Sequence, residues 1–189
     1  MLAHRLAMRR TLLIAAFILA PASAFAGECP TTDAAALDRK LSPLLERLAD
    51  APTEREGDLR ADDIWIIWRT APDAAAQDLL DKGVRRIRVS DYPEAERLLG
   101  ELIAYCPDYA EGWNQRAFAR FLSGDFDGAL ADLDRTLELY PRHFAAMAGR
   151  GLTLLKQGRT LLGHKAIREA VALHPWMRER HLLPPDQKT

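Results

Sequence analysis

The side chains that most often bind metals or do chemistry have no metal-binding or catalytic spacing in this sequence. Past residue 26, no histidine lies three or four positions from another histidine or from a cysteine, as a metal-binding pair on one helix would require. We therefore expect surface or loop histidines, no bound metal and no cofactor. The histidines concerned are His143, His164, His174 and His181.

Catalytic motifs are missing as well. There is no glycine-rich phosphate loop, and Ser90 and Ser123 fall in predicted turns outside any nucleophile-elbow pattern. Acid pairs such as Glu94 and Glu96 are common on helix faces and do not indicate catalysis. The sequence predicts that the protein is not an enzyme, and catalysis is kept only as the last of three hypotheses.

Residues 1–26 have the features of a cleaved secretory signal peptide. Arginines precede an apolar run over residues 11–20, and Ala24 and Ala26 supply the small residues that a signal peptidase reads, with cleavage before Gly27. The alternative is a retained membrane anchor, but the apolar run is shorter than the ~20 residues that a spanning helix needs. We expect a secreted bacterial protein in the periplasm, without stable membrane insertion after cleavage.

The charge of the remaining chain excludes two classes of partner. With the three arginines of residues 1–26 removed, 23 Lys and Arg remain against 27 Asp and Glu, a formal net charge of −4. A mildly acidic chain with interspersed charges does not suggest a nucleic acid or an anionic membrane surface as partner. The partner is expected to be another protein or peptide, and no small-molecule cofactor is expected.

Two cysteines, Cys29 and Cys106, remain after the predicted cleavage. An even number of cysteines in an oxidising compartment favours a disulfide, which would hold the N-terminal segment against the first repeat described below. The alternative is a buried Cys106 and a free Cys29.

One pattern recurs every 34 residues between Leu79 and Pro175. A large residue is followed four positions later by a small one, which lets a neighbouring helix approach closely. A Ser or Gly then ends that helix, an apolar stripe follows, and a proline ends the second helix. The recurring positions are Leu79/Trp113/Met147, Gly83/Ala117/Gly151, Ser90/Gly124/Gly158, Ala95/Ala129/Gly163, Leu99/Leu133/Ile167, Leu102/Thr136/Ala170 and Pro107/Pro141/Pro175.

This period and order of residue types resemble the tetratricopeptide repeat, in which each unit is two antiparallel helices and the units stack into a solenoid. The resemblance implies an all-α, short right-handed α-solenoid. It places three tandem units at residues 76–109, 110–143 and 144–177. Three residues depart from the family pattern and weaken individual packing contacts in the analogy. They are Arg86 and Arg120, where an aromatic is usual, and Gly163, where an alanine is usual.

The flanks are expected to cap the array. Residues 27–75 contain a predicted helix over 34–51, a polar linker and a second helix over about 61–70. This pair is either a degenerate fourth repeat or an unrelated capping hairpin, and at least one tryptophan in it should be buried. Residues 178–189 read as a C-terminal capping helix and tail, with Trp176 packed on the last unit.

In the family, the first helices of the units line a concave groove that binds peptides or helices. The resemblance therefore implies a scaffold that mediates protein–protein interaction through this groove, with apolar anchors of about 1.5–3 kcal/mol each. The alternative is a structural subunit of a cell-envelope complex, whose groove is filled by its own N-terminal helix. The positions that grip a terminal carboxylate in one family variant hold no matching residues here, so a chaperone-tail clamp is not expected. The predicted partner-binding residues are Leu80, Val84, Ile87, Arg88, Asn114, Phe118, Phe121, Leu152 and Leu155.

Overall fold

The structure is a computed structural model that describes residues 28–185, so the predicted signal peptide lies outside the described residues. The fold is all-α, as predicted, and the described part of the chain contains no β-strand. No helix within that part is long and apolar enough to cross a membrane. The helices are α1 (Ala34–Ala49), α2 (Glu54–Trp68), α3 (Ala74–Arg88), α4 (Tyr92–Tyr105), α5 (Ala110–Ser123), α6 (Phe126–Leu139), α7 (Phe144–Lys156), α8 (Thr160–Leu173) and the 3-10 helix η1 (Arg178–Leu182).

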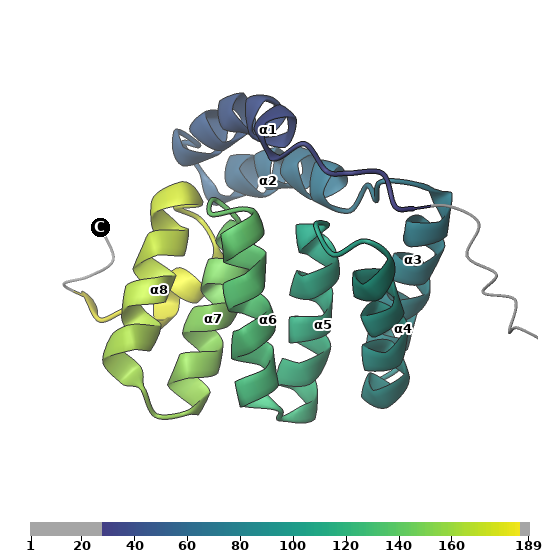
Figure 1. The fold of residues 1–189 in the computed structure, drawn as a ribbon. Helices are drawn as coiled ribbons and strands as arrows, with labels where there is room; N and C mark the ends of the chain where they lie inside the picture. Colours follow the sequence, from purple (N-terminus) through teal and green to yellow (C-terminus); the bar gives the residue numbers. More distant parts are fainter. Residues whose placement is uncertain (1–27, 186–189) are drawn as a thin grey trace, which may run out of the picture.

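Helices α3 to α8 form three antiparallel pairs that stand side by side (Figure 1). Each pair lies within one 34-residue period of the sequence. The first helix of each pair ends at a residue with left-handed backbone geometry, with φ of 60° at Ser90, 89° at Gly124 and 75° at Gly158. Glycine adopts this geometry without steric cost. The turn position therefore recurs because each unit must leave its first helix in the same way.

Small residues let the two helices of a pair approach closely. A Cβ atom built on Gly83 would lie 2.6 Å from the Leu99 side chain, and one on Gly151 would lie 2.9 Å from the carbonyl oxygen of Gly163. Gly163, a departure from the family pattern, thus allows a closer approach of α7 and α8 instead of weakening their packing. These glycines belong to the packed interface of the helix pairs.

Replacing Gly163 with alanine is expected to destabilise the protein, although alanine favours helix formation. The new Cβ would lie 2.8 Å from Leu155 and 2.9 Å from the Gly151 carbonyl oxygen. Overpacking of about 1–3 kcal/mol should outweigh the helix-propensity gain of about 1 kcal/mol. In the control variant Gly100→Ala, the nearest atom lies 3.7 Å away, so the gain should remain. Urea unfolding of both variants measures the difference, and a more stable Gly163→Ala protein would contradict the packing described here.

Helix α2 begins earlier than the sequence suggests. It starts at Glu54, where we predicted a polar linker reaching to residue 60. Thr53 caps the helix, because its hydroxyl accepts a hydrogen bond of 3.3 Å from the backbone N–H of Glu56. Gly57, predicted to lie in the linker, is buried in α2 beneath the side chain of Trp176.

Helices α1 and α2 lie across one end of the three helix pairs and do not stack beside α3 (Figure 1). Helix α1 contacts α8, and one hydrophobic cluster joins Leu45 and Trp68 of this hairpin to Phe144 and Ile167 of the last pair. The burial of Trp68, which is 4% exposed, agrees with the predicted tryptophan anchor. The arrangement is that of a closing hairpin, not of a fourth unit in the array.

Trp176, which we predicted to pack on the last unit, contacts the α1–α2 hairpin. Its indole Nε1 donates a hydrogen bond of 2.6 Å to the carbonyl oxygen of Ala51, and its side chain covers Gly57. The reason is the position of the hairpin, which brings the start of α2 to the C-terminal end of the array. The N-terminal hairpin and the segment after α8 are therefore in contact.

Cys29 and Cys106 lie at disulfide-bonding distance, with their Sγ atoms 1.96 Å apart and their Cα atoms 5.3 Å apart. Cys106 is the C-cap residue of α4 and is 2% exposed. The pair fastens the segment before α1 to the first helix pair.

Candidate functional site

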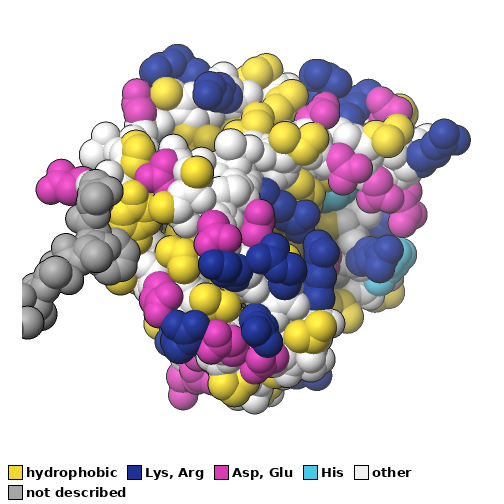
Figure 2. Space-filling model, turned by 90° about the vertical axis from the view of Figure 1, so that its right-hand side faces the viewer, with side chains coloured by type: hydrophobic (Ala, Val, Ile, Leu, Met, Phe, Trp, Pro, Cys, Tyr) yellow, Lys and Arg dark blue, Asp and Glu magenta, His cyan; other side chains and the backbone are white. Residues whose placement is uncertain are grey.

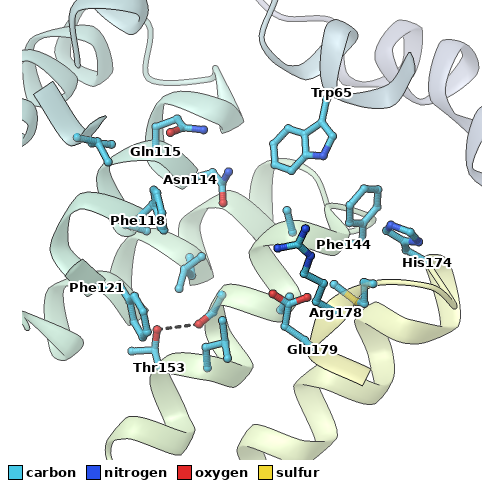
Figure 3. A pocket seen from close by; sticks show the side chains of 18 of the residues that line it. Trp65, Asn114, Gln115, Phe118, Phe121, Phe144, Thr153, His174, Arg178 and Glu179 are labelled. Atoms are coloured by element: carbon cyan, nitrogen blue, oxygen red, sulfur yellow. Dashed lines mark hydrogen bonds between the residues drawn. The ribbon is translucent and has the colours of Figure 1, made fainter. Parts of the chain in front are cut away.

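A cavity of about 500 Å³ opens on the face formed by α3, α5 and α7, the first helix of each pair. Helix α2 borders it on one side and the chain after α8 borders it on another (Figure 3). We call this cavity the groove. Its lining includes Asp58, Trp65 and Arg69 of α2, Val84, Ile87 and Arg88 of α3, Asn114, Phe118 and Phe121 of α5, Phe144, Leu152 and Thr153 of α7, and His174, Arg178 and Glu179.

The middle of the groove carries exposed aromatic surface. Phe118 is 48% exposed, and Phe121 is half-buried with its ring 5.8 Å from that of Phe126. Both side chains project from α5 into the groove (Figure 3). Opposite them, α7 contributes the small residues Ala148 and Gly149, which leave room for an inserted side chain. Covering one such phenylalanine would contribute about 1.5–3 kcal/mol.

Seven of the nine predicted partner-binding residues line this groove. They are Val84, Ile87, Arg88, Asn114, Phe118, Phe121 and Leu152.

The other two, Leu80 and Leu155, lie elsewhere. Leu80 is 2% exposed and belongs to the core between α3 and α4. Leu155 packs on Gly163, the glycine at which α8 approaches α7. Both side chains pack between helices. Fewer residues of α3 and α7 therefore line the groove than the family analogy implies.

Several groove residues come from outside the repeats and were missed. Trp65 and Arg69 enter from α2, and Arg178 and Glu179 enter from η1 (Figure 3). The guanidinium carbon of Arg69 lies 4.6 Å from the centre of the Trp65 ring, a cation–π geometry. The only signal in the sequence was the apolar turn around Trp65, which indicated burial but not its partner.

A buried carboxylate lies at the hairpin end of the groove. Glu111 is 1% exposed, and the side-chain amides of Asn114 and Gln115 donate hydrogen bonds of 3.0 and 2.6 Å to it. The Nε2 atom of His143 lies 3.2 Å from the same carboxylate. This network, called the Glu111 network below, joins the start of α5 to the start of α7 and orients Asn114 in the groove wall.

His143 lies in the loop before α7, which agrees with the prediction of surface or loop histidines, but its side chain is buried. Its Nδ1 accepts a hydrogen bond from the backbone N–H of Ala146, so Nε2 carries the proton that it donates to Glu111. The ring stacks on Trp68 with centroids 3.8 Å apart. The hairpin therefore covers a position that would otherwise lie in an open loop.

His174 lies in the loop after α8, and its side chain is also buried, in the groove wall. Burial lowers its pKa, which keeps the ring neutral near neutral pH. No set of three or more His, Cys, Asp or Glu side chains within residues 28–185 is placed to hold a metal ion.

Stability is expected to fall at alkaline pH, because two tyrosines are buried. Burial raises the pKa of Tyr140 to about 12 and raises the pKa of Tyr109 as well, with Glu111 adding to the effect. In the unfolded chain, tyrosine has a pKa of about 10. The stability that the buried, protonated tyrosines give is therefore complete below about pH 10, and it is lost as the pH rises from there through the pKa values of the folded state. Thermal unfolding between pH 8 and about pH 12 measures the loss.

Two single substitutions separate the contributions of these tyrosines. The hydroxyl of Tyr140 has no hydrogen-bond partner within residues 28–185, so Tyr140→Phe should be at least as stable as the natural protein and less sensitive to alkali. The hydroxyl of Tyr109 donates a 2.6 Å bond to the Trp68 carbonyl oxygen, so Tyr109→Phe should be less stable. Equal effects of the two substitutions would contradict this assignment.

Side-by-side helix pairs with a groove along their first helices define an α-solenoid of helical repeats. Residues 119–175 match the family model described as tetratricopeptide repeat. The matched segment contains most of the second and third helix pairs. This chain therefore contains tetratricopeptide repeats.

Proteins with the same repeat are similar in sequence to part of this chain. A TPR repeat-containing protein of Rhizobium etli is 32% identical over 115 residues, which are 61% of this chain and 56% of that protein. Tetratricopeptide repeat protein 36 of Xenopus tropicalis is 38% identical over 104 residues, 52% of this chain and 50% of that protein. The chain thus spans about half the length of these relatives.

Solved structures resemble the chain less closely. The TPR2B domain of yeast Sti1, in a complex with pHsp70, is 24% identical with a TM-score of 0.49, covering 53% of this chain and 82% of that one. MamA is 17% identical with a TM-score of 0.49, covering 73% of this chain and 84% of that one.

Proposed function

We propose that this protein is a non-catalytic interaction module that binds a segment of a partner protein in the groove. The observation that carries the proposal is the exposure of Phe118, which is 48% exposed inside a cavity of about 500 Å³. A large aromatic side chain on a helix is normally buried against a neighbour, and here the described chain leaves it uncovered. A partner segment with an apolar side chain would cover it.

The alternative is a structural subunit whose own N-terminal helix fills the groove. Helix α2 does reach the groove, where Trp65 and Arg69 form part of its wall. However, the ring of Trp65 packs toward Trp68 and Phe144, with centroids 5.3 and 6.2 Å away, at one end of the groove. The aromatic surface of α5 remains open, which favours a partner from outside the chain.

We also propose that the protein works outside the cytoplasm, in the periplasm of a bacterium. The support is the signal-like sequence of residues 1–26 and the Cys29–Cys106 pair, a kind of bond that persists in oxidising compartments. N-terminal sequencing of the exported protein should find Gly27 as the first residue.

The binding proposal is tested by capturing partners from periplasmic extract with the exported protein and two variants. Phe118→Glu places a charge on the groove surface and should abolish capture of the specific partner. Leu161→Glu is the matched control, because Leu161 is 85% exposed on α8 and does not line the groove. It should capture the same partner as the natural protein.

Circular dichroism and thermal unfolding check that both variants are folded. Loss of the partner from a folded Phe118→Glu protein, with retention by Leu161→Glu, supports the proposal. Retention by both variants would show that the partner binds another surface. Unfolding of Phe118→Glu alone would show that Phe118 belongs to the core, and would also contradict the proposal.

A further inference from the structure

Three arginines line the groove without a carboxylate partner within residues 28–185. They are Arg69 of α2, Arg88 of α3 and Arg178 of η1. Arg69 lies against the face of Trp65, and Figure 3 shows the guanidinium group of Arg178 pointing into the cavity. The consecutive helices α2 and α3 and the distant segment η1 thus each direct a cation to the same opening.

Several arginines elsewhere on the repeats bind carboxylates. Arg116 binds Asp132 through two hydrogen bonds of 2.8 and 2.7 Å, Arg120 binds the same carboxylate at 2.9 Å, and Arg150 binds Asp134 at 2.7 Å. The chain after residue 26 is acidic as a whole, so its carboxylates outnumber its cations. The three groove arginines, by contrast, have no carboxylate partner within residues 28–185.

Two of the three groove cations, Arg69 at the C-terminal end of α2 and Arg88 of α3, lie toward the α3 end of the groove. The groove also contains two carboxylates, Asp58 and Glu179, and Glu179 lies beside Arg178 in Figure 3. Figure 2 views the molecule from the α3 and α4 end and shows Lys and Arg side chains gathered beside a hollow in the surface. The two lining carboxylates come from the start of α2 and from η1, so no lining carboxylate comes from α3, and Arg69, Arg88 and Phe118 line the same cavity.

We propose that the partner segment is an acidic amphipathic peptide. One or more of its Asp or Glu side chains would bind Arg88 and Arg69, and an adjacent apolar side chain would cover Phe118. A guanidinium group binds a carboxylate through two parallel hydrogen bonds, which fixes orientation as well as charge. The proposal rests on the proposed function, since it names the chemistry of the segment that the same groove takes.

The recognised carboxylates are side-chain carboxylates, so the test uses peptides with amidated C-termini. Peptides of 12 residues are selected from a random phage-displayed library on the exported protein, synthesised with a fluorescent label, and measured by fluorescence anisotropy. We expect selected sequences that combine Asp or Glu with Phe, Leu or Trp. Replacing their acidic residues with Asn or Gln should weaken binding by about tenfold or more.

Two charge reversals on the protein locate the contact. Arg88→Glu should weaken binding of the acidic peptides by about tenfold or more, and a peptide with Lys in place of its acidic residue should then bind the variant better than it binds the natural protein. Lys40→Glu is the matched control, because Lys40 is exposed on α1 and does not line the groove. It should leave the affinity unchanged.

The outcomes separate this inference from the proposed function. Peptides that lose binding with Phe118→Glu but are neutral or basic, or that bind Arg88→Glu normally, would overturn the acidic preference and leave groove binding intact. Selected peptides that bind Phe118→Glu as well as the natural protein would overturn both.

Discussion

Replacement of Glu111 with alanine is expected to lower the free energy of unfolding by about 3–5 kcal/mol. The carboxylate is 1% exposed and accepts hydrogen bonds from Asn114, Gln115 and His143. Removing it leaves three buried donors without an acceptor and opens a cavity between α5 and α7. Each unsatisfied buried donor costs about 1–3 kcal/mol, partly relieved where water can enter.

Urea unfolding of Glu111→Ala measures this effect beside two comparison variants. Glu111→Gln keeps the shape but presents an amide donor to the network, so a smaller loss of about 1–3 kcal/mol is expected. Glu138→Ala is the matched control, because that side chain is 66% exposed and pairs only with Arg135 within the described residues. It should change stability by about 0.5 kcal/mol or less. A Glu111→Ala protein as stable as this control would show that the network does not hold α5 and α7 together.

The same substitution is expected to weaken partner binding even under conditions where the variant is folded. Asn114 both donates to Glu111 and lines the groove, so its orientation depends on the carboxylate. His143 also links the network to Trp68 of the closing hairpin, through stacking at 3.8 Å. The Glu111 network therefore couples the hairpin to the wall of the groove.

Removal of the cysteine pair is expected to lower the free energy of unfolding by about 4.5 kcal/mol, the chain-entropy value for a loop of this size. The two cysteines are 77 residues apart, and the loop between them contains the closing hairpin and the first helix pair. Without the bond, the segment before α1 would no longer be held against α4. The hairpin would then rely on its apolar contacts with the last repeat.

The double variant Cys29→Ser, Cys106→Ser tests this expectation by thermal unfolding with and without a reductant. The natural protein should lose stability when the reductant is added, and the variant should not respond to it. Thiol titration of the exported, unfolded natural protein should find no free thiol. Two free thiols would show that the pair is not bonded in the exported protein and would remove this support for an oxidising compartment.

The sequence by itself determined the three helix pairs and most of the residues that pack within them, although Leu80 and Leu155 were assigned to the groove. This was possible because the signals are local. The large residue, the small residue four positions later and the turn residue all lie within one unit, and the order is repeated. The left-handed geometry at Ser90, Gly124 and Gly158 explains why one turn position could be recognised in all three units. Repetition also placed Phe118 and Phe121 on the helix face that lines the groove.

Only the tertiary structure decided how the hairpin and the C-terminal segment complete the groove. The bond from Trp176 to Ala51 joins residues 125 positions apart, and no local pattern specifies which distant apolar surface a capping helix will cover. The burial of His143 under Trp68 and the presence of Arg69 and Arg178 in the groove lining follow from the position of the hairpin. Helical period and spacing describe what a segment must bury, whereas the position of its partner depends on the contacts of the whole chain.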